Sequence, residues 1–236
     1  MNKTSKIIII ILSVATVAAI IAGLSIHVFR NNSIVLFGSK TVTDTVEPEG
    51  ELKELVIDTD YANVSVSRGD KLSVSYSLPE KLVPKVEFSN GRLTIESPKN
   101  NVTLLPFGGK QDYYISLTLP KDTESDRVTV ELDAGNLNID GLSSKSVAIE
   151  VDAGNVNLKN CSAEKLGVEL DAGNLEMTGC TIHSINAELD AGNIFAKDCV
   201  ISDGSCETDL GNIDLSGDIG NVNMKTSLGK TSVNNR

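Results

Sequence analysis

The four residues Asp-Ala-Gly-Asn occur four times in this chain, and each copy begins 19 residues after the last. Variants continue the series one interval later at Asp209-Leu210-Gly211-Asn212, then at nine-residue steps from Asp218 and Ser227, which indicates a half-period. A unit of 19 residues is too short for a helical hairpin with its turns, whereas it suits one coil of a β-solenoid. The repeat therefore predicts a stack of coils.

Apolar and polar residues alternate on both sides of this motif. Counted from the repeat Asp as position zero, the apolar positions are −5, −3 and −1 before the motif and +4 and +6 after it. A period of two is typical of a strand with one buried face. Low aromatic content (4%, no Trp) fits a narrow core of stacked aliphatic side chains. We expect an all-β fold, a right-handed single-stranded β-helix with 19-residue coils.

The repeated motif has the residue types that a sharp corner needs. Asp can accept a hydrogen bond from the backbone two residues on, Gly can take a positive φ, and stacked Asn side chains can bond to one another along the solenoid. Calcium binding is the alternative, but the paired glycines of the toxin β-roll repeat are absent, which favours a structural role. The corner residues are Asp133, Gly135, Asn136, Asp152, Gly154, Asn155, Asp171, Gly173, Asn174, Asp190, Gly192 and Asn193, and Asn212 and Asn221 extend the Asn column.

An outward column of glutamates lies two residues before the repeat Asp. Its members are Glu131, Glu150, Glu169, Glu188 and Glu207. Like charges about 5 Å apart in water repel by roughly 0.8 kcal/mol per pair before salt screening. A solvated acidic stripe is the favoured interpretation, and a stripe that weakly binds Ca²⁺, Mg²⁺ or a polycation is the alternative. No metal site and no cofactor is assigned.

No catalytic group of residues is recognisable. His183 is the one histidine outside the apolar N-terminal run, and zinc, nucleophile and phosphate-loop motifs are lacking. The abundant carboxylates leave a glycan-active enzyme as a minor alternative. Cys161, Cys180 and Cys199 share the apolar position +9, so we expect them and Cys206 to be buried thiols, with disulfides as the alternative.

The N-terminal 30 residues differ from the rest. Lys3 and Lys6 precede an uncharged run from Ile7 to Phe29, which as a helix would be about 30 Å or more in length, enough to span a bilayer. We expect one transmembrane signal anchor with residues 31–236 outside the cytoplasm, or a secreted protein if the segment is cleaved. Because residues 1–30 contain three basic and no acidic side chains, the remainder has a net charge of −14, compared with −11 for the whole chain. This charge disfavours nucleic acid as a partner.

We divide the chain into a signal anchor (1–30), a linker (31–51), an irregular β region (52–127) and the regular repeat (128–236). Asn90-Gly91 lies between two alternating runs and predicts a hairpin. Asp60-Tyr61-Ala62-Asn63 resembles a degenerate corner, so residues 52–127 either open the same solenoid or form a separate small β-domain.

Three features resemble the bacterial putative-adhesin domain family over about residues 50–233. They are the run from Tyr114 to Pro120, the following run from Val128 to Asp133, and the Gly-Asn-apolar-x-apolar units from Gly135 onward. The resemblance implies a right-handed β-helical extracytoplasmic domain, often membrane-anchored, and in some members associated with cell-envelope stress responses. It implies no catalytic residues.

These observations favour a membrane-anchored, non-enzymatic bacterial surface protein that is adhesin-like or senses envelope stress. The expected partners are an envelope component, a cationic peptide or another surface protein. The main alternative is an end-to-end assembling scaffold, because the ends of a solenoid expose unpaired strands. The polar tail residues Thr231, Ser232, Asn234, Asn235 and Arg236 indicate instead that the C-terminal end is capped.

Overall fold

The computed structural model describes residues 34–35, 40–98, 103–104 and 113–235. The predicted signal anchor (1–30) lies outside these residues, and no helix among the described residues is long and apolar enough to cross a membrane. Strands β1 (Ile34–Val35) and β8 (Thr103–Leu104) pair in parallel and belong to a unit of their own. The other described residues form the solenoid.

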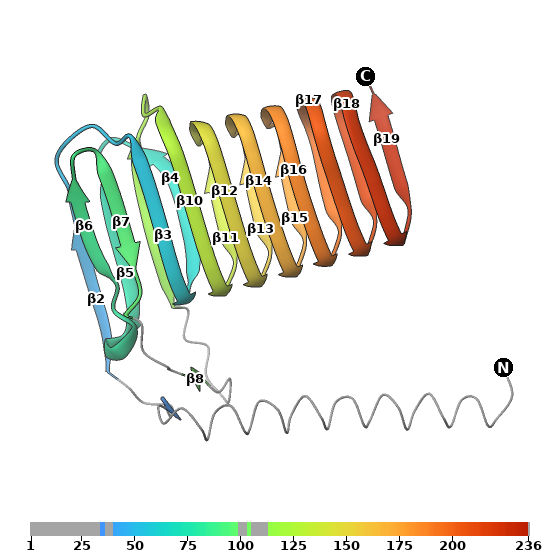
Figure 1. Ribbon diagram of the computed structural model, residues 1–236. Coiled ribbons are helices and arrows are strands. Elements are labelled where there is room, and N and C mark those ends of the chain that lie inside the picture. Colours follow the sequence, from blue (N-terminus) through green and yellow to red (C-terminus); the bar gives the residue numbers. More distant parts are fainter. Residues whose placement is uncertain (1–33, 36–39, 99–102, 105–112, 236) are drawn as a thin grey trace, which may run out of the picture. The chain divides into compact units, whose positions relative to one another are not determined.

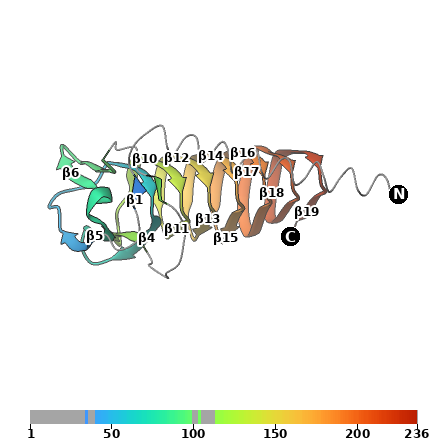
Figure 2. The ribbon, with the colours of Figure 1, turned by 90° about the horizontal axis from the view of Figure 1, so that it is seen from below.

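Two rows of strands build the solenoid (Figure 1). The long face consists of β6 (Lys85–Ser89), β7 (Arg92–Glu96), β3 (Glu54–Tyr61), β10 (Ser125–Ala134), β12 (Ser143–Ala153), β14 (Ser162–Ala172), β16 (Thr181–Ala191) and the C-terminal parts of β17 (Ile194–Leu210) and β18 (Ile213–Leu228). The short face consists of β2 (Thr41–Val46), β5 (Ser73–Pro79), β9 (Tyr114–Pro120), β4 (Asn63–Gly69), β11 (Leu137–Asp140), β13 (Val156–Lys159), β15 (Leu175–Thr178), the N-terminal parts of β17 and β18, and β19 (Thr231–Asn235). A single 3-10 turn, η1 (Glu80–Leu82), follows β5 among the described residues. Figure 2 shows the two rows on opposite sides of the stack.

The strands stack in the predicted register. Val128 pairs with Val147, Val147 with Leu166 and Leu166 with Ile185, each 19 residues on, and all four side chains are buried. The other apolar columns are buried in the same way, so each coil covers the apolar edge of the next. The structure thus confirms the all-β solenoid and its 19-residue coil.

The first coil is not at the end of the stack. Strands β3 and β4 form a coil that pairs with β10 and β11 on one side and with β7 and β9 on the other. Asn63 therefore bonds to Asn136, 73 residues later in the chain. Strands β3 to β7 and β9 thus lie in the same sheet as the regular repeat, and the chain places β7 and β9 on one side of the first coil before it places β10 and β11 on the other.

Antiparallel strands cover the end of the stack beyond β7 and β9. The predicted hairpin forms between β6 and β7, with positive φ at both Asn90 and Gly91. On the short face, β5 pairs with β9 and β2 pairs with β5. Strand β2 lies in the segment that we expected to be a linker, and it is instead part of the sheet.

The Asn column forms the predicted ladder. From Asn63 through Asn136, Asn155, Asn174 and Asn193 to Asn212, each Nδ2 donates to the Oδ1 of the preceding member at 2.9–3.2 Å, and the backbone N–H donates to the same oxygen. No backbone donor bonds to the repeat aspartates among the described residues, so the expected Asx turn is not part of the corner.

Glycine is required at this corner because the coils approach each other closely. Gly154 has a φ of +158°, and a Cβ built on it would overlap the carbonyl oxygen of Gly135 in the preceding coil. The same overlap recurs at the equivalent glycine of the next coils. Any side chain here would force neighbouring coils apart.

A second corner, at position +8, was not recognised in the sequence. Gly141, Asn160, Gly179 and Asp198 all have φ between +50° and +79° there. Gly, Asn and Asp can all adopt the left-handed conformation, so different residues occupy this corner and the sequence shows no repeat there.

The half-period was a wrong interpretation. Asp218 pairs with Val200 inside the long face, and the Nδ2 of Asn221 donates to Asp203 Oδ1 at 3.0 Å, so neither belongs to a corner. Lys230 instead ends the series, because its backbone N–H donates to Asn212 Oδ1 at 3.0 Å. The last coil has 18 residues, since Ile213 pairs with Thr231.

All four cysteines are free and buried, in agreement with the favoured prediction. The Sγ of Cys161 donates to the carbonyl oxygen of Lys159 at 3.2 Å, and Cys199 donates in the same way to Lys197 at 3.3 Å. Burial raises the pKa of Cys206 to about 12. These thiols are part of the core.

Candidate functional site

The glutamate column extends over the long face as a straight file. Glu131 pairs with Glu150, and the same pairing continues in register to Glu207, with Asp58 as a further member on the other side of Glu131. The repeat aspartates follow two residues later on the same surface. We define the acidic face as these twelve residues: Asp58, Asp60, Glu131, Asp133, Glu150, Asp152, Glu169, Asp171, Glu188, Asp190, Glu207 and Asp209.

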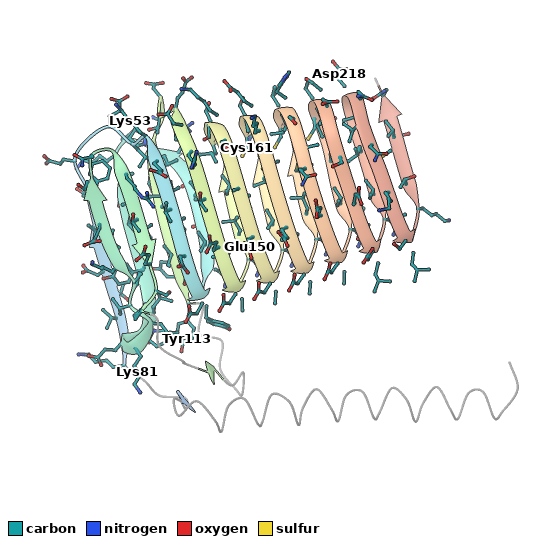
Figure 3. The ribbon with its side chains drawn as sticks, in the orientation of Figure 1. Lys53, Lys81, Tyr113, Glu150, Cys161 and Asp218 are labelled. Atoms are coloured by element: carbon teal, nitrogen blue, oxygen red, sulfur yellow. The ribbon has the colours of Figure 1, made fainter. Side chains whose placement is uncertain are left out.

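Few cations balance these carboxylates. Of the salt bridges between described residues, one reaches the acidic face, where Lys225 Nζ lies 2.9 Å from Glu207 Oε2 at the C-terminal end. Asn186 Nδ2 donates to Glu188 Oε1 at 2.9 Å, and Ser227 Oγ donates to Asp209 Oδ1 at 3.0 Å. Figure 3 labels Glu150 in the middle of the file. The remaining carboxylates are open to solvent and to a partner.

Neighbouring aspartates influence the ionisation of Asp60 and Asp133 near the first corner. Burial, and then the carboxylates of Asp60, Asp152 and Asp58, raise the pKa of Asp133. Burial and then Asp58 raise the pKa of Asp60. Burial is the larger cause of both shifts, and the smaller contribution of the neighbouring carboxylates is one that a nearby positive charge would offset.

A shallow groove runs beside the glutamates. Its floor is made of small side chains at position −4, where Thr129, Ala148 and Gly167 follow one another, and its volume is about 250 Å³. A second hollow of about 160 Å³ lies between Glu188, Asp190 and their equivalents Glu207 and Asp209. An extended chain could therefore lie along the axis with basic side chains beside the carboxylates.

The arrangement does not resemble a chelating site. Carboxylates of successive coils form a row with a spacing of about 4.8 Å. No group of three His, Cys, Asp or Glu side chains among the described residues could hold a metal ion. His183 lines a different hollow, beside Lys145 and Glu164. The face can attract cations over an area, which is the chemistry of a binding surface.

Sequence reasoning missed the two members of the acidic face that come from β3. Asp58 and Asp60 belong to it because β3 pairs with β10, and the degenerate corner at Asp60-Tyr61-Ala62-Asn63 was the signal for that pairing. Lys225 was missed because it pairs with Glu207 at an interval of 18 residues, whereas the other coils have 19.

The chain is similar to solved structures of bacterial proteins. A putative adhesin from Bacteroides fragilis NCTC 9343 has a TM-score of 0.52 and 16% identity, over 84% of this chain and 98% of that chain. A putative cell adhesion protein from Clostridium sporogenes ATCC 15579 has a TM-score of 0.49 and 15% identity, over 84% of this chain and 100% of that chain. A putative lipid binding protein from Parabacteroides distasonis ATCC 8503 has a TM-score of 0.46 and 18% identity, over 85% and 98%.

The likeness to the Bacteroides fragilis protein shows a shared fold alone. The proteins are described as adhesins or binding proteins and not as enzymes. No curated protein matches the chain. The family model Toastrack DUF4097 matches residues 52–234, which includes the first coil, the strands that follow it and the whole regular repeat. The chain belongs to the Toastrack DUF4097 family.

Proposed function

We propose that this chain is a non-enzymatic binding protein of the bacterial cell surface whose acidic face recognises a cationic partner. The observation that supports this is the acidic face, whose twelve carboxylates have a single salt-bridged lysine among the described residues. A cationic peptide or the basic surface of an envelope protein would relieve the repulsion between coils. Association would be fast and sensitive to salt.

The same proposal includes the anchoring and the role expected from the sequence. Residues 1–30 act as a signal anchor, and the right-handed solenoid lies outside the cytoplasm, or is released if the segment is cleaved. A bound cation would stabilise the stack because it offsets repulsion between neighbouring coils. This coupling between binding and stability suits a sensor of cationic compounds at the cell envelope as well as an adhesin.

Binding of a 12-residue Lys/Arg peptide to the full chain tests the proposal. The triple substitution of Glu150, Glu169 and Glu188 by Gln removes three adjacent charges. Exposed ion pairs each contribute about 0.2–1 kcal/mol, so we expect the Kd to rise about tenfold at low salt. Titration calorimetry at low and high NaCl measures it.

A matched control removes three charges elsewhere. Glu49, Glu80 and Glu176 are exposed and lie off the acidic face, so their substitution by Gln changes the net charge equally. We expect a smaller, long-range effect. Equal loss of affinity in both triple variants would show that net charge, and not the acidic face, binds the peptide.

One observation favours a second candidate, the end-to-end scaffold. At the C-terminal end, β19 and the C-terminal part of β18 have no further strand beside them among the described residues. Leu228 is 69% exposed and Val233 is 39% exposed there. The expected polar cap forms strand β19 instead. Light scattering of the full chain against concentration tests assembly, and Val233→Lys should abolish any polymer that uses this edge.

A further inference from the structure

Three of the four tyrosines, Tyr61, Tyr113 and Tyr114, lie at the first corner of the solenoid, next to the end of the acidic face at Asp60. Tyr61 occupies the position that is Ala134, Ala153, Ala172 and Ala191 in later coils. It is 39% exposed, so the core does not require its ring. A large aromatic side chain therefore lies at a surface position where the next four coils have alanine and the last two have the exposed Leu210 and Leu228.

Two of these rings form adjoining walls of a pocket. The centroids of Tyr61 and Tyr113 lie 6.1 Å apart with their planes at 72°. The pocket measures about 340 Å³, and its remaining lining consists of Ala62, Asn63, Ala134, Gly135, Asn136 and Ala153. Figure 3 labels Tyr113 beside this corner. The volume falls within the range of small-ligand sites.

The first member of the Asn ladder supplies a polar group at this pocket. Asn63 Oδ1 accepts two hydrogen bonds from Asn136, both at 3.1 Å. Its backbone N–H donates to the carbonyl oxygen of Tyr113 at 3.0 Å. The Nδ2 of Asn63 has no acceptor among the described residues, because no earlier Asn precedes it in the ladder. An exposed amide donor is thus held in a defined orientation beside two aromatic rings.

We propose that this pocket binds a neutral hexopyranose residue of a glycan. The apolar face of a sugar ring would stack on Tyr61, and the Nδ2 of Asn63 would donate to a hydroxyl or acetamido oxygen. Tyrosine offers a large, rigid, amphipathic surface at low entropic cost. No charged side chain lines the pocket, which favours a neutral ligand over the basic partner of the acidic face. The inference is independent of the proposed function.

The test uses two neutral trisaccharides and the full chain. An N-acetylglucosamine trimer represents amino-sugar polymers of the bacterial wall, and a galactose trimer represents glycans that lack the acetamido group. The protein is kept in a detergent without a sugar headgroup. Saturation-transfer NMR and calorimetry should show that at least one trimer binds with a Kd of about 1 mM or lower.

Substitutions at one position separate binding from folding. Tyr61→Ala introduces the residue that later coils use, so it should fold and melt as the wild type does, and it should weaken binding at least tenfold. Tyr61→Phe keeps the ring and should bind as the wild type does. Phe195→Ala is the control, because Phe195 is also 39% exposed but lies on the short face.

Three results would overturn the inference. They are the absence of binding by either trimer, equal binding in Tyr61→Ala, and loss of binding in Phe195→Ala as large as in Tyr61→Ala. Tyr61-dependent binding of the Lys/Arg peptide without any glycan binding would assign the pocket to cations instead. The acidic-face triple variant should bind the trimers normally, so failure here and failure of the proposed function are distinguishable.

Discussion

Two glycines of one coil should respond in opposite ways to the same substitution. Gly173 has a φ of +154°, and a Cβ there would overlap the carbonyl group of Gly154. Gly167, six residues earlier, would place its Cβ 3.9 Å from the nearest atom, the carbonyl oxygen of Val147, which is an ordinary contact. We therefore predict that Gly173→Ala destabilises the solenoid and that Gly167→Ala does not.

The magnitude follows from the bonds around the corner. Between the two coils, the backbone N–H of Gly154 donates to the carbonyl oxygen of Ala172 at 2.9 Å, that of Val156 donates to the carbonyl oxygen of Asn174 at 2.9 Å, and that of Asn174 donates to Asn155 Oδ1 at 3.0 Å. Separating the coils to admit a methyl group would stretch all three. At about 1 kcal/mol for each bond and about 1–3 kcal/mol for the strained φ, we expect a loss of roughly 4–6 kcal/mol. Gly167→Ala should gain about 0.4–1 kcal/mol, because alanine restricts the unfolded chain.

Thermal unfolding followed by far-ultraviolet circular dichroism measures both variants. For a chain of this size about 1 kcal/mol shifts Tm by 2–4 °C, so Gly173→Ala should melt roughly 8–24 °C below the wild type. Hydrogen exchange should locate the loss at the corners of the two coils. If both variants melt together, the close approach of the coils is not what requires glycine, and the explanation of the corner is wrong.

Four other predictions follow from the same contacts. Asn155→Ala removes one donated and two accepted ladder bonds and should cost about 1–2 kcal/mol in urea unfolding, more than Asn157→Ala, whose side chain makes one bond. The pKa of Asp133 is raised by burial and by its aspartate neighbours, so its ionisation costs stability as pH rises through the folded pKa. Asp133→Asn should therefore raise Tm at pH 7, and this gain should shrink as pH falls towards 3.8, the ordinary value for Asp; a constant gain would contradict the assignment. Ca²⁺ should raise Tm no more than NaCl of equal ionic strength, because the carboxylates form a row and not a chelating group. A larger rise would restore the calcium alternative. A thiol reagent at pH 8 should modify few cysteines in the native protein and four after denaturation, since the hydrogen-bonding neighbour Cys161, and then burial, raise the pKa of Cys180 to about 11.

The regular part of the fold was predictable because identical short-range needs recur in every coil. Buried positions must hold apolar residues, the closely packed corner must hold glycine, and the side-chain ladder must hold Asn. The residue types themselves therefore repeat. The corner at position +8 has a conformational need that Gly, Asn and Asp all meet. Its members differ from coil to coil, and the repeat was invisible for that reason.

Motifs alone also misled at the C-terminal end. Asp218-Ile219-Gly220-Asn221 imitates a corner, yet Ile219 is buried within the long face and pairs with Ile201. Its pairing is decided by the shorter last coil and the irregularity between Ala196 and Cys199, which shift the register of the strand. A motif match says nothing about which coil a residue stacks on.

The sequence by itself determined the period, the buried columns, the Asn ladder and the outward file of glutamates, because these arise from local alternation and repeat spacing. Only the tertiary structure decided that β3 and β4 lie between β7 and β9 on one side and β10 and β11 on the other. That order depends on backbone pairing between residues as far apart as Val64 and Leu137. It brings Asp58 and Asp60 into the acidic face and Tyr61 beside Tyr113, so the two candidate binding surfaces are consequences of long-range strand pairing.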